Sequence, residues 1–141
     1  MLKNIPKIVS PELLKILCEM GHGDEMVLSD AHFPAYAAGV PVLQATGVNV
    51  PELLDAILGV WQLDQYVEKP AVMMAPVPGD TLDENYVALC RKVMQDHGEK
   101  GEIDFIERFA FYERTRKVHC VVVTGETRKY GNLLIKKGVI C

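Results

Sequence analysis

The chain has 141 residues, of which 49% are hydrophobic and 24% are charged, as is typical of a globular protein with one hydrophobic core. Its formal net charge of -4 argues against non-specific nucleic-acid binding, which requires a basic surface. No apolar run reaches the roughly 20 residues that span a bilayer, and residues 1–15 lack the continuous apolar core of a signal peptide. We therefore expect a cytoplasmic protein that binds neither nucleic acid nor membrane. The 4 cysteines stand alone, without the spacing of a metal site.

The N-terminal half of the chain predicts two helices separated by a strand and a loop. Ser10 is a suitable cap for the first helix, and Gly21 is a suitable stop. The second helix repeats the pattern of the first, with an early proline and leucines on one face. The expected helix, strand, loop and helix lie over residues 10–21, 25–30, 31–41 and 49–61.

The C-terminal half continues the alternation of short apolar strands with helices. Its segments are an apolar strand, an amphipathic helix, a segment that begins extended and becomes helical, and two strands, over 70–75, 82–98, 103–118, 119–125 and 133–139. Such alternation predicts an α/β fold. We expect a single layered domain, residues 1–141, with a mainly parallel sheet flanked by helices.

One histidine, His22, lies between two glycines at the turn from the first helix into the first strand. Glycine lets the backbone turn sharply and leaves the imidazole accessible. Because an imidazole titrates near pH 6.5, at about the pH of the cell, His22 is a candidate for proton transfer in either direction. The alternative is a histidine in a surface turn that is hydrogen-bonded to Asp24.

Asp30 ends the strand that follows, where α/β folds commonly place ligand-contacting groups. Ser29 or Asp30 could instead cap the turn after the strand. A further alternative is a metal site with mixed nitrogen and oxygen ligands, built from His22, Asp24, Asp30 and His32. These residues lack a tight ligand spacing, so the metal site is the weaker of the alternatives.

Two later segments carry aromatic and polar groups. Residues 107–116 combine aromatic residues with arginines, a pattern that usually means core packing beside a solvated face and that does not by itself select a binding arginine. Residues 129–132, KYGN, place a phenol and a carboxamide on either side of a glycine. These groups suit a polyhydroxylated ligand, because each hydroxyl is both donor and acceptor, although KYGN could equally form only a turn. Nucleotide-binding, serine-hydrolase and zinc-protease motifs are absent.

Four blocks of the sequence, taken together, resemble the RbsD/FucU family of sugar mutarotases. They are MGHGDEMVLSDAHFPAY, RFAFYER, VVVTGE and KYGNLLIKKGV, which begin at residues 20, 108, 121 and 129. The resemblance covers almost the whole chain and is weakest over 83–104. It is greatest to the L-fucose mutarotase branch, because the ribose pyranase branch shares GHGD but usually lacks the forms DAHFP and RFAFYER.

The resemblance implies an isomerase that interconverts the α and β anomers of L-fucose by acid/base-catalysed ring opening and reclosure, without cofactor or metal. The residues that it implies at the site are the proton donor His22 and the substrate-binding residues Asp30, Arg108, Tyr130, Gly131 and Asn132. Tyr130 could also relay the anomeric proton. A homo-oligomer is implied as well, for which a decameric ring is one expectation. D-ribose pyranase activity, or monosaccharide binding without catalysis, are the alternatives that stay open.

Overall fold

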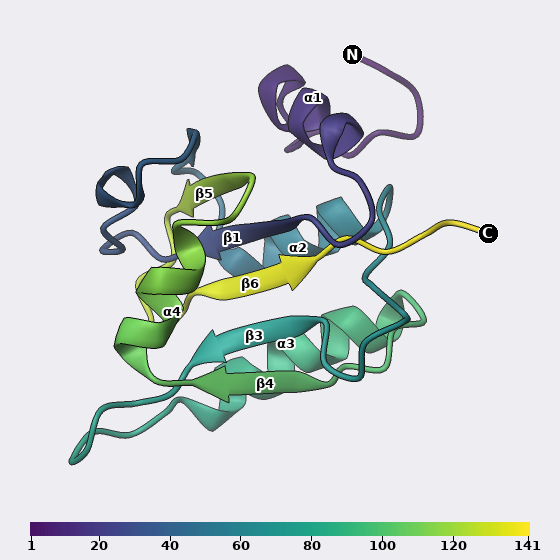
Figure 1. The fold of residues 1–141 in the computed structure, drawn as a ribbon. Coiled ribbons are helices and arrows are strands. Elements are labelled where there is room, and N and C mark those ends of the chain that lie inside the picture. The colour runs from purple at the N-terminus through teal and green to yellow at the C-terminus, as the bar shows by residue number, and fades with distance from the viewer.

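Six strands form one mixed sheet in a computed structural model that describes residues 1–141 (Figure 1). The strands lie in the order β2-β5-β1-β6-β3-β4, and every strand except β6 runs in the same direction. The expected α/β fold with a mainly parallel sheet is therefore confirmed. The strands are β1 (Glu25–Ser29), β2 (Val42–Ala45), β3 (Ala71–Met74), β4 (Ile103–Ile106), β5 (Cys120–Thr124) and β6 (Leu133–Lys136).

The helices begin at the caps that the sequence provides. The Ser10 hydroxyl accepts a hydrogen bond from the Leu13 backbone N–H at 3.1 Å, and Asn49 with Glu52 forms a reciprocal capping box. Each such cap stabilises its helix by about 1 kcal/mol. None of the helices is both long enough and apolar enough to cross a membrane. They are α1 (Pro11–Glu19), the 3₁₀ helix η1 (Tyr36–Ala38), α2 (Val50–Leu58), α3 (Glu84–Asp96) and α4 (Arg108–Thr115).

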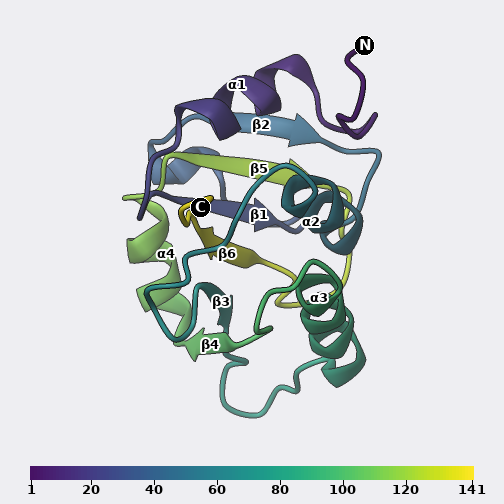
Figure 2. The ribbon, with the colours of Figure 1, turned by 90° about the vertical axis from the view of Figure 1, so that its right-hand side faces the viewer.

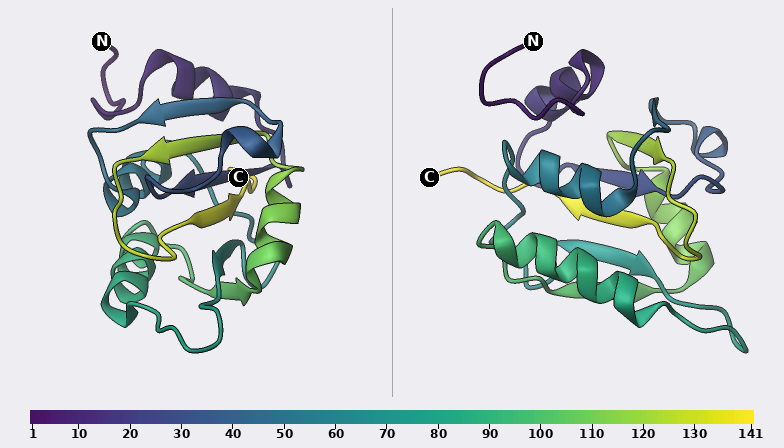
Figure 3. Two further views of the ribbon diagram at one scale, coloured as in Figure 1. Left: turned by 90° about the vertical axis from the view of Figure 1, so that its left-hand side faces the viewer. Right: turned by 180° about the vertical axis from the view of Figure 1, so that it is seen from behind.

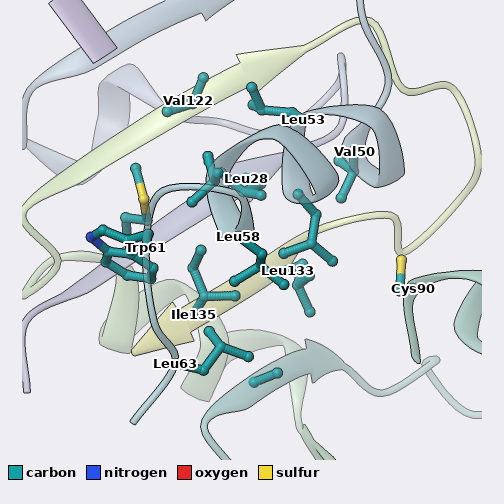
Figure 4. Close-up of a cluster of buried hydrophobic side chains, with 14 of the residues drawn as sticks. Leu28, Val50, Leu53, Leu58, Trp61, Leu63, Cys90, Val122, Leu133 and Ile135 are labelled. Atoms are coloured by element: carbon teal, nitrogen blue, oxygen red, sulfur yellow. The ribbon is translucent and has the colours of Figure 1, made fainter. Parts of the chain in front are cut away.

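Helices cover both faces of the sheet, with α2 and α3 on one face and α4 on the other (Figure 2). Successive strand residues point to opposite faces. Leu28 and Leu133 therefore pack with Leu53 of α2 in the larger core (Figure 4), whereas Leu134 packs with Phe111 of α4 in the smaller one. A fully buried leucine contributes about 1.5–3 kcal/mol, so this burial holds the helices against the sheet.

Strand β2 was missing from the sequence-based prediction, which left residues 42–45 without regular structure. It is a short edge strand beside β5, with Leu43 opposite Val122 (Figure 3, left). Its apolar pattern is weak, because its residues are only partly buried and Gln44 is polar and exposed. Its pairing with β5, about 80 residues later in the sequence, is a long-range contact that no local pattern reveals.

The reversal of β6 brings together segments from distant parts of the chain at two opposite edges of the sheet. At one edge the parallel strands end and β6 begins, next to α4; this is the left side of Figure 1. At the other edge β1 begins and β6 ends, and the Gly23 backbone N–H donates to the Lys137 carbonyl at 2.9 Å. We call these the strand-end edge and the strand-start edge.

Candidate active site

A cavity of about 260 Å³ opens at the strand-end edge. This volume lies just below the range of about 300–1,000 Å³ for pockets that hold drug-sized ligands, so the cavity suits a smaller molecule. Its walls come from the segments that follow β1 and β3, the start of α4 and the loop before β6. The lining residues are Asp30, His32, Phe33, Pro34, Met74, Val77, Arg108, Tyr112, Lys129, Tyr130 and Asn132.

Asp30 directly follows β1 and is the only acidic residue in this lining. Its carboxylate accepts a hydrogen bond from the His32 backbone N–H at 3.0 Å. Burial raises the pKa of Asp30 above its usual value, and the backbone amides of His32 and Gly131 only partly oppose this effect. The structure thus places a partly desolvated carboxylate against the cavity, where it can accept hydrogen bonds from a ligand.

Asn132 is fixed beside Asp30 by the register of β1 with β6. Its Oδ1 accepts a hydrogen bond from the Asp30 backbone N–H at 2.8 Å. This bond occupies the carbonyl end of the carboxamide and leaves the Nδ2 group as a donor at the cavity. Asp30 and Asn132 together therefore offer a ligand both an acceptor and a donor.

Arg108 is the first residue of α4 and extends along the cavity wall. Its guanidinium lies 4.6 Å from the centre of the Phe109 ring and forms no ion pair. Its N–H groups remain available to oxygen atoms of a ligand. The sequence pattern did not distinguish Arg108 from Arg114 and Arg116, but the structure does, because Arg114 pairs with Glu25 and Arg116 faces Glu113.

The loop before β6 contributes Tyr130 but not Gly131 to the lining. Gly131 instead shapes the turn, since a Cβ atom there would lie 2.8 Å from the Arg128 carbonyl oxygen. The Gly131 carbonyl accepts a hydrogen bond from the buried Tyr86 hydroxyl at 2.6 Å. The Tyr130 hydroxyl donates a hydrogen bond to Asp80 Oδ2 at 2.8 Å, and its role as a relay of the anomeric proton stays a prediction.

His22 lies at the strand-start edge and does not line the cavity. His22 precedes β1 and Asp30 follows it. The five residues of β1 rise about 3.3 Å each, so the strand alone separates the two residues by about 16 Å. The structure therefore does not bring His22 and Asp30 into one pocket within a single chain. The same separation means that the four residues of the metal-site alternative form no ligand cluster within one chain, because His22 and Asp24 lie at the opposite edge from Asp30 and His32.

The partner of His22 is Asp64, a residue that the sequence did not single out. His22 Nε2 donates to Asp64 Oδ1 at 3.1 Å, and the imidazole packs 5.3 Å from the Tyr66 ring, centre to centre. Asp24 instead accepts a hydrogen bond from the Gly21 backbone N–H. Asp64 is only 3% exposed while His22 is 47% exposed, so a buried carboxylate orients an accessible ring.

The Asp64 carboxylate is ionised in the folded protein at neutral pH. Burial acts to raise its pKa, but the hydrogen bonds from the Tyr66 backbone N–H and from His22 outweigh burial and hold the pKa below its usual value. An ionised acceptor on Nε2 leaves Nδ1 as the nitrogen that can exchange a proton with a ligand. The strand-start edge thus presents an oriented acid/base group without a cavity of its own.

The fold and the sequence place this protein in a known family. The sequence model of the RbsD / FucU transport protein family matches residues 3–140, so the chain belongs to that family. The resemblance drawn from the sequence blocks is confirmed.

Several relatives are named for one activity. The chain is 53% identical over 143 residues to the L-fucose mutarotase of Actinobacillus pleuropneumoniae serotype 5b, covering 99% of this chain and 97% of that protein. It is 50% identical to the L-fucose mutarotase of Glaesserella parasuis, with 99% and 96% covered. The fucose mutarotase of Streptococcus pneumoniae, solved in complex with L-fucose, superposes with a TM-score of 0.93 at 44% identity, with 99% and 100% covered. Bacillus subtilis RbsD, complexed with D-ribose, shares the fold at 21% identity with a TM-score of 0.80.

Proposed function

We propose that this chain is an L-fucose mutarotase and that residues 1–141 form one sugar mutarotase domain. The observation that carries the proposal is the cavity, in which Asp30, Arg108 and Asn132 offer hydrogen-bond acceptors and donors opposite an apolar wall that includes Met74 and Val77. A 6-deoxy sugar has the matching character, since its hydroxyls need polar partners and its methyl group does not. The relatives named for L-fucose mutarotation support the same substrate. A free monosaccharide substrate agrees with the expected cytoplasmic location.

Mutarotation requires one proton to leave the anomeric hydroxyl and one to reach the ring oxygen, after which the C1–O5 bond opens. The carbonyl then turns about C1–C2, and closure on its other face gives the other anomer. Protonated His22 donates to the ring oxygen through Nδ1 and recovers the proton on closure. The anomeric hydroxyl gives its proton to solvent water on opening and regains one on closure, while Asp30, Arg108 and Asn132 hold the other hydroxyls. A positioned acid/base contributes about 10²–10⁴ in rate, which is proportionate to a reaction that also proceeds slowly without an enzyme.

This mechanism needs a second copy of the chain. Proton transfer requires heavy atoms within about 3 Å, and His22 is much farther from the cavity of its own chain. We therefore infer a homo-oligomer in which His22 of one subunit completes the cavity of a neighbour. The surface around His22 and the surface around the cavity each carry an exposed aromatic side chain. Tyr66, beside His22, is 70% exposed, and Phe109, beside Arg108, is 63% exposed. Aromatic residues are enriched at protein interfaces.

The two surfaces differ from each other, so a head-to-tail contact between them is the simplest arrangement. Head-to-tail contacts form a ring when the rotation between neighbours closes and a filament when it does not, so this contact is compatible with the decameric ring that the sequence resemblance implied. A two-fold dimer in which the subunits exchange His22 is the alternative, and the mass of the assembly distinguishes the two.

Subunit complementation tests the shared site. His22→Ala and Arg108→Ala, each purified alone, should lose most of the acceleration of L-fucose anomer exchange measured by saturation-transfer NMR. When the two variants are unfolded together and refolded at equal amounts, one site in four should pair an intact cavity with an intact His22, restoring about a quarter of wild-type activity. This value follows only if the site lies between subunits.

A control variant, a second sugar and a binding measurement accompany the complementation experiment. His97→Ala removes another histidine that is paired with an aspartate, Asp55, at 2.7 Å, and should retain full activity. Mixing that leaves activity at the level of the single variants would place the site within one chain. D-ribose measured in parallel separates the ribose pyranase alternative, and sugar binding without accelerated exchange in the wild type would indicate a binding protein.

A further inference from the structure

Asp80 joins two loops that both form the wall of the cavity. It lies in the loop between β3 and α3, which extends past the strand-end edge (Figure 1), and it is not itself one of the lining residues. Its Oδ2 accepts the Tyr130 hydroxyl proton at 2.8 Å, and both of its oxygens accept from Lys129 Nζ, at 2.9 and 3.2 Å. The Thr81 backbone N–H donates to Oδ1 at 2.8 Å. Hydrogen bonds from Lys129 and then Tyr130 lower the pKa of Asp80 to about 2, so these contacts involve the carboxylate.

A further hydrogen bond, which does not involve Asp80, also connects the two loops. The Val77 backbone N–H, in the same loop as Asp80, donates to the Tyr130 hydroxyl oxygen at 3.3 Å. The Tyr130 hydroxyl is thus an acceptor toward one part of the loop and a donor toward another. Val77, Lys129 and Tyr130 all line the cavity, so the bonds around Asp80 set the positions of three lining residues at once.

Tyr130 also needs an external restraint. Its φ of 56° lies in the left-handed region, which is unfavourable for a non-glycine residue and persists only where neighbouring contacts enforce it. Gly131, which follows, cannot accept a side chain without a clash with the Arg128 carbonyl. The backbone conformation on the cavity side is therefore strained at Tyr130, and the contact to Asp80 holds that side chain in place.

We propose that Asp80 is a positioning residue for sugar binding: it links the loop of residues 75–83 to the loop of residues 126–132 and keeps Tyr130 against the cavity. The proposal rests on the proposed function for the identity of the sugar. Asp80 has no contact with the reacting atoms, so its loss should weaken the binding of L-fucose and leave the proton transfer by His22 nearly unchanged.

Hydrogen exchange in the absence of sugar tests the link itself. In Asp80→Ala, the backbone amides of both loops should exchange faster together, as measured by mass spectrometry of peptides that cover each loop. Asp96→Ala is the matched control, because it removes an aspartate paired with Lys92 at 2.7 Å on the exposed surface of α3. Faster exchange confined to the loop of residues 75–83, or no change in either loop, would overturn the proposal. This measurement is valid whether or not L-fucose is the substrate.

Kinetics of L-fucose anomer exchange test the consequence for binding. Asp80→Ala should raise KM at least about fivefold, with kcat within about twofold of the wild-type value. Asp80→Asn can still accept from Thr81 and Lys129, so its KM should lie between those of Asp80→Ala and the wild type. Tyr130→Phe removes the same link, so the double variant with Asp80→Ala should be little worse than the worse single variant. A fall in kcat at unchanged KM, or fully multiplicative effects of the two substitutions, would refute the positioning role. Absence of exchange in the wild type would instead refute the proposed function.

Discussion

The fold shifts the pKa values of two aspartates at opposite ends of β1 in opposite directions. Burial raises the pKa of Asp30 at the cavity, whereas Asp64 beside His22 has its pKa lowered despite burial, because two hydrogen bonds favour its charged form. As the pH falls from neutral, Asp30 is therefore the first of the two to be protonated. The acceptor in the cavity should be lost while the acceptor that orients His22 is still ionised.

Sugar binding should accordingly show an acid limit above the ordinary aspartate pKa of 3.8. The measurement is L-fucose binding to His22→Ala as a function of pH, because this variant lacks the other ionisable group that we propose to act on the sugar. Binding should weaken as the pH falls through the raised pKa of Asp30, and Asp30→Asn should bind weakly with no such dependence. The same raised pKa means that protonation of Asp30 favours the folded state, so circular dichroism should show no unfolding caused by this group across that pH interval. Binding that persists below pH 3.8 would contradict the assignment of Asp30.

Sequence patterns identified the residues that have local signals and missed those that depend on distant partners. His22 stands out through its flanking glycines, and Asp30 through its position at a strand end. Asp64 meets His22 across 42 positions, and Asp80 meets Tyr130 across 50, so neither has a neighbour in the sequence that reveals its role. These two carboxylates become identifiable only when the sheet has brought their partners together.

Among the elements of the fold, the helices were predicted well because their signals are local. Ser10 and Asn49 each bond to a backbone amide three residues ahead, so cap and helix start lie within one turn of sequence. Strand β2 was missed because its stability comes from pairing with β5. The reversal of β6 was also not predicted, since a mainly parallel sheet leaves the direction of its last strand undetermined. That reversal is what places Asn132 beside Asp30.

The turn before β6 should tolerate no side chain at Gly131. Gly131→Ala would place a Cβ atom 2.8 Å from the Arg128 carbonyl oxygen and 3.0 Å from Glu126 Cγ, and overpacking of this kind typically costs about 1–3 kcal/mol. Denaturant unfolding should therefore show a lower free energy of unfolding, together with weaker L-fucose binding. Gly47→Ala is the control, because an added Cβ there meets no atom within 4 Å. Equal stability of the two variants would mean that the turn adjusts without loss.

At the scale of the whole molecule, the proposed mechanism requires an assembly, because one chain does not bring its own His22 to its own cavity. The chain presents His22 with Asp64 at one edge of the sheet and the cavity at the other, and exposed Tyr66 and Phe109 lie beside them. An aromatic side chain that is buried between subunits resists replacement by a charged one, because the charge would lose its hydration. Interface aromatics are also the residues that commonly dominate binding energy.

Tyr66→Glu or Phe109→Glu should therefore separate the subunits and abolish mutarotation, while the chain remains folded. Light scattering gives the mass in solution, circular dichroism the fold, and saturation-transfer NMR the exchange rate. Leu89→Glu, at an exposed apolar position on α3, is the matched control and should keep both assembly and activity. A monomeric variant that still exchanges the anomers at the wild-type rate would show that the site does not require a neighbouring subunit.

Strand β6 has a consequence for the order in which the protein becomes active during its synthesis. Asn132, just before the strand, accepts a hydrogen bond from the Asp30 backbone N–H at one edge of the sheet. At the other edge, the carbonyl of Lys137, just after the strand, accepts one from the Gly23 backbone N–H. His22 and Asp30 leave the ribosome about 100 residues before β6, the strand to which the surroundings of both residues are bonded. A nascent chain thus carries neither the finished cavity nor the finished histidine turn. Under the proposed mechanism, catalysis therefore has to wait until β6 has been made, and this one strand completes both surfaces of the proposed subunit contact.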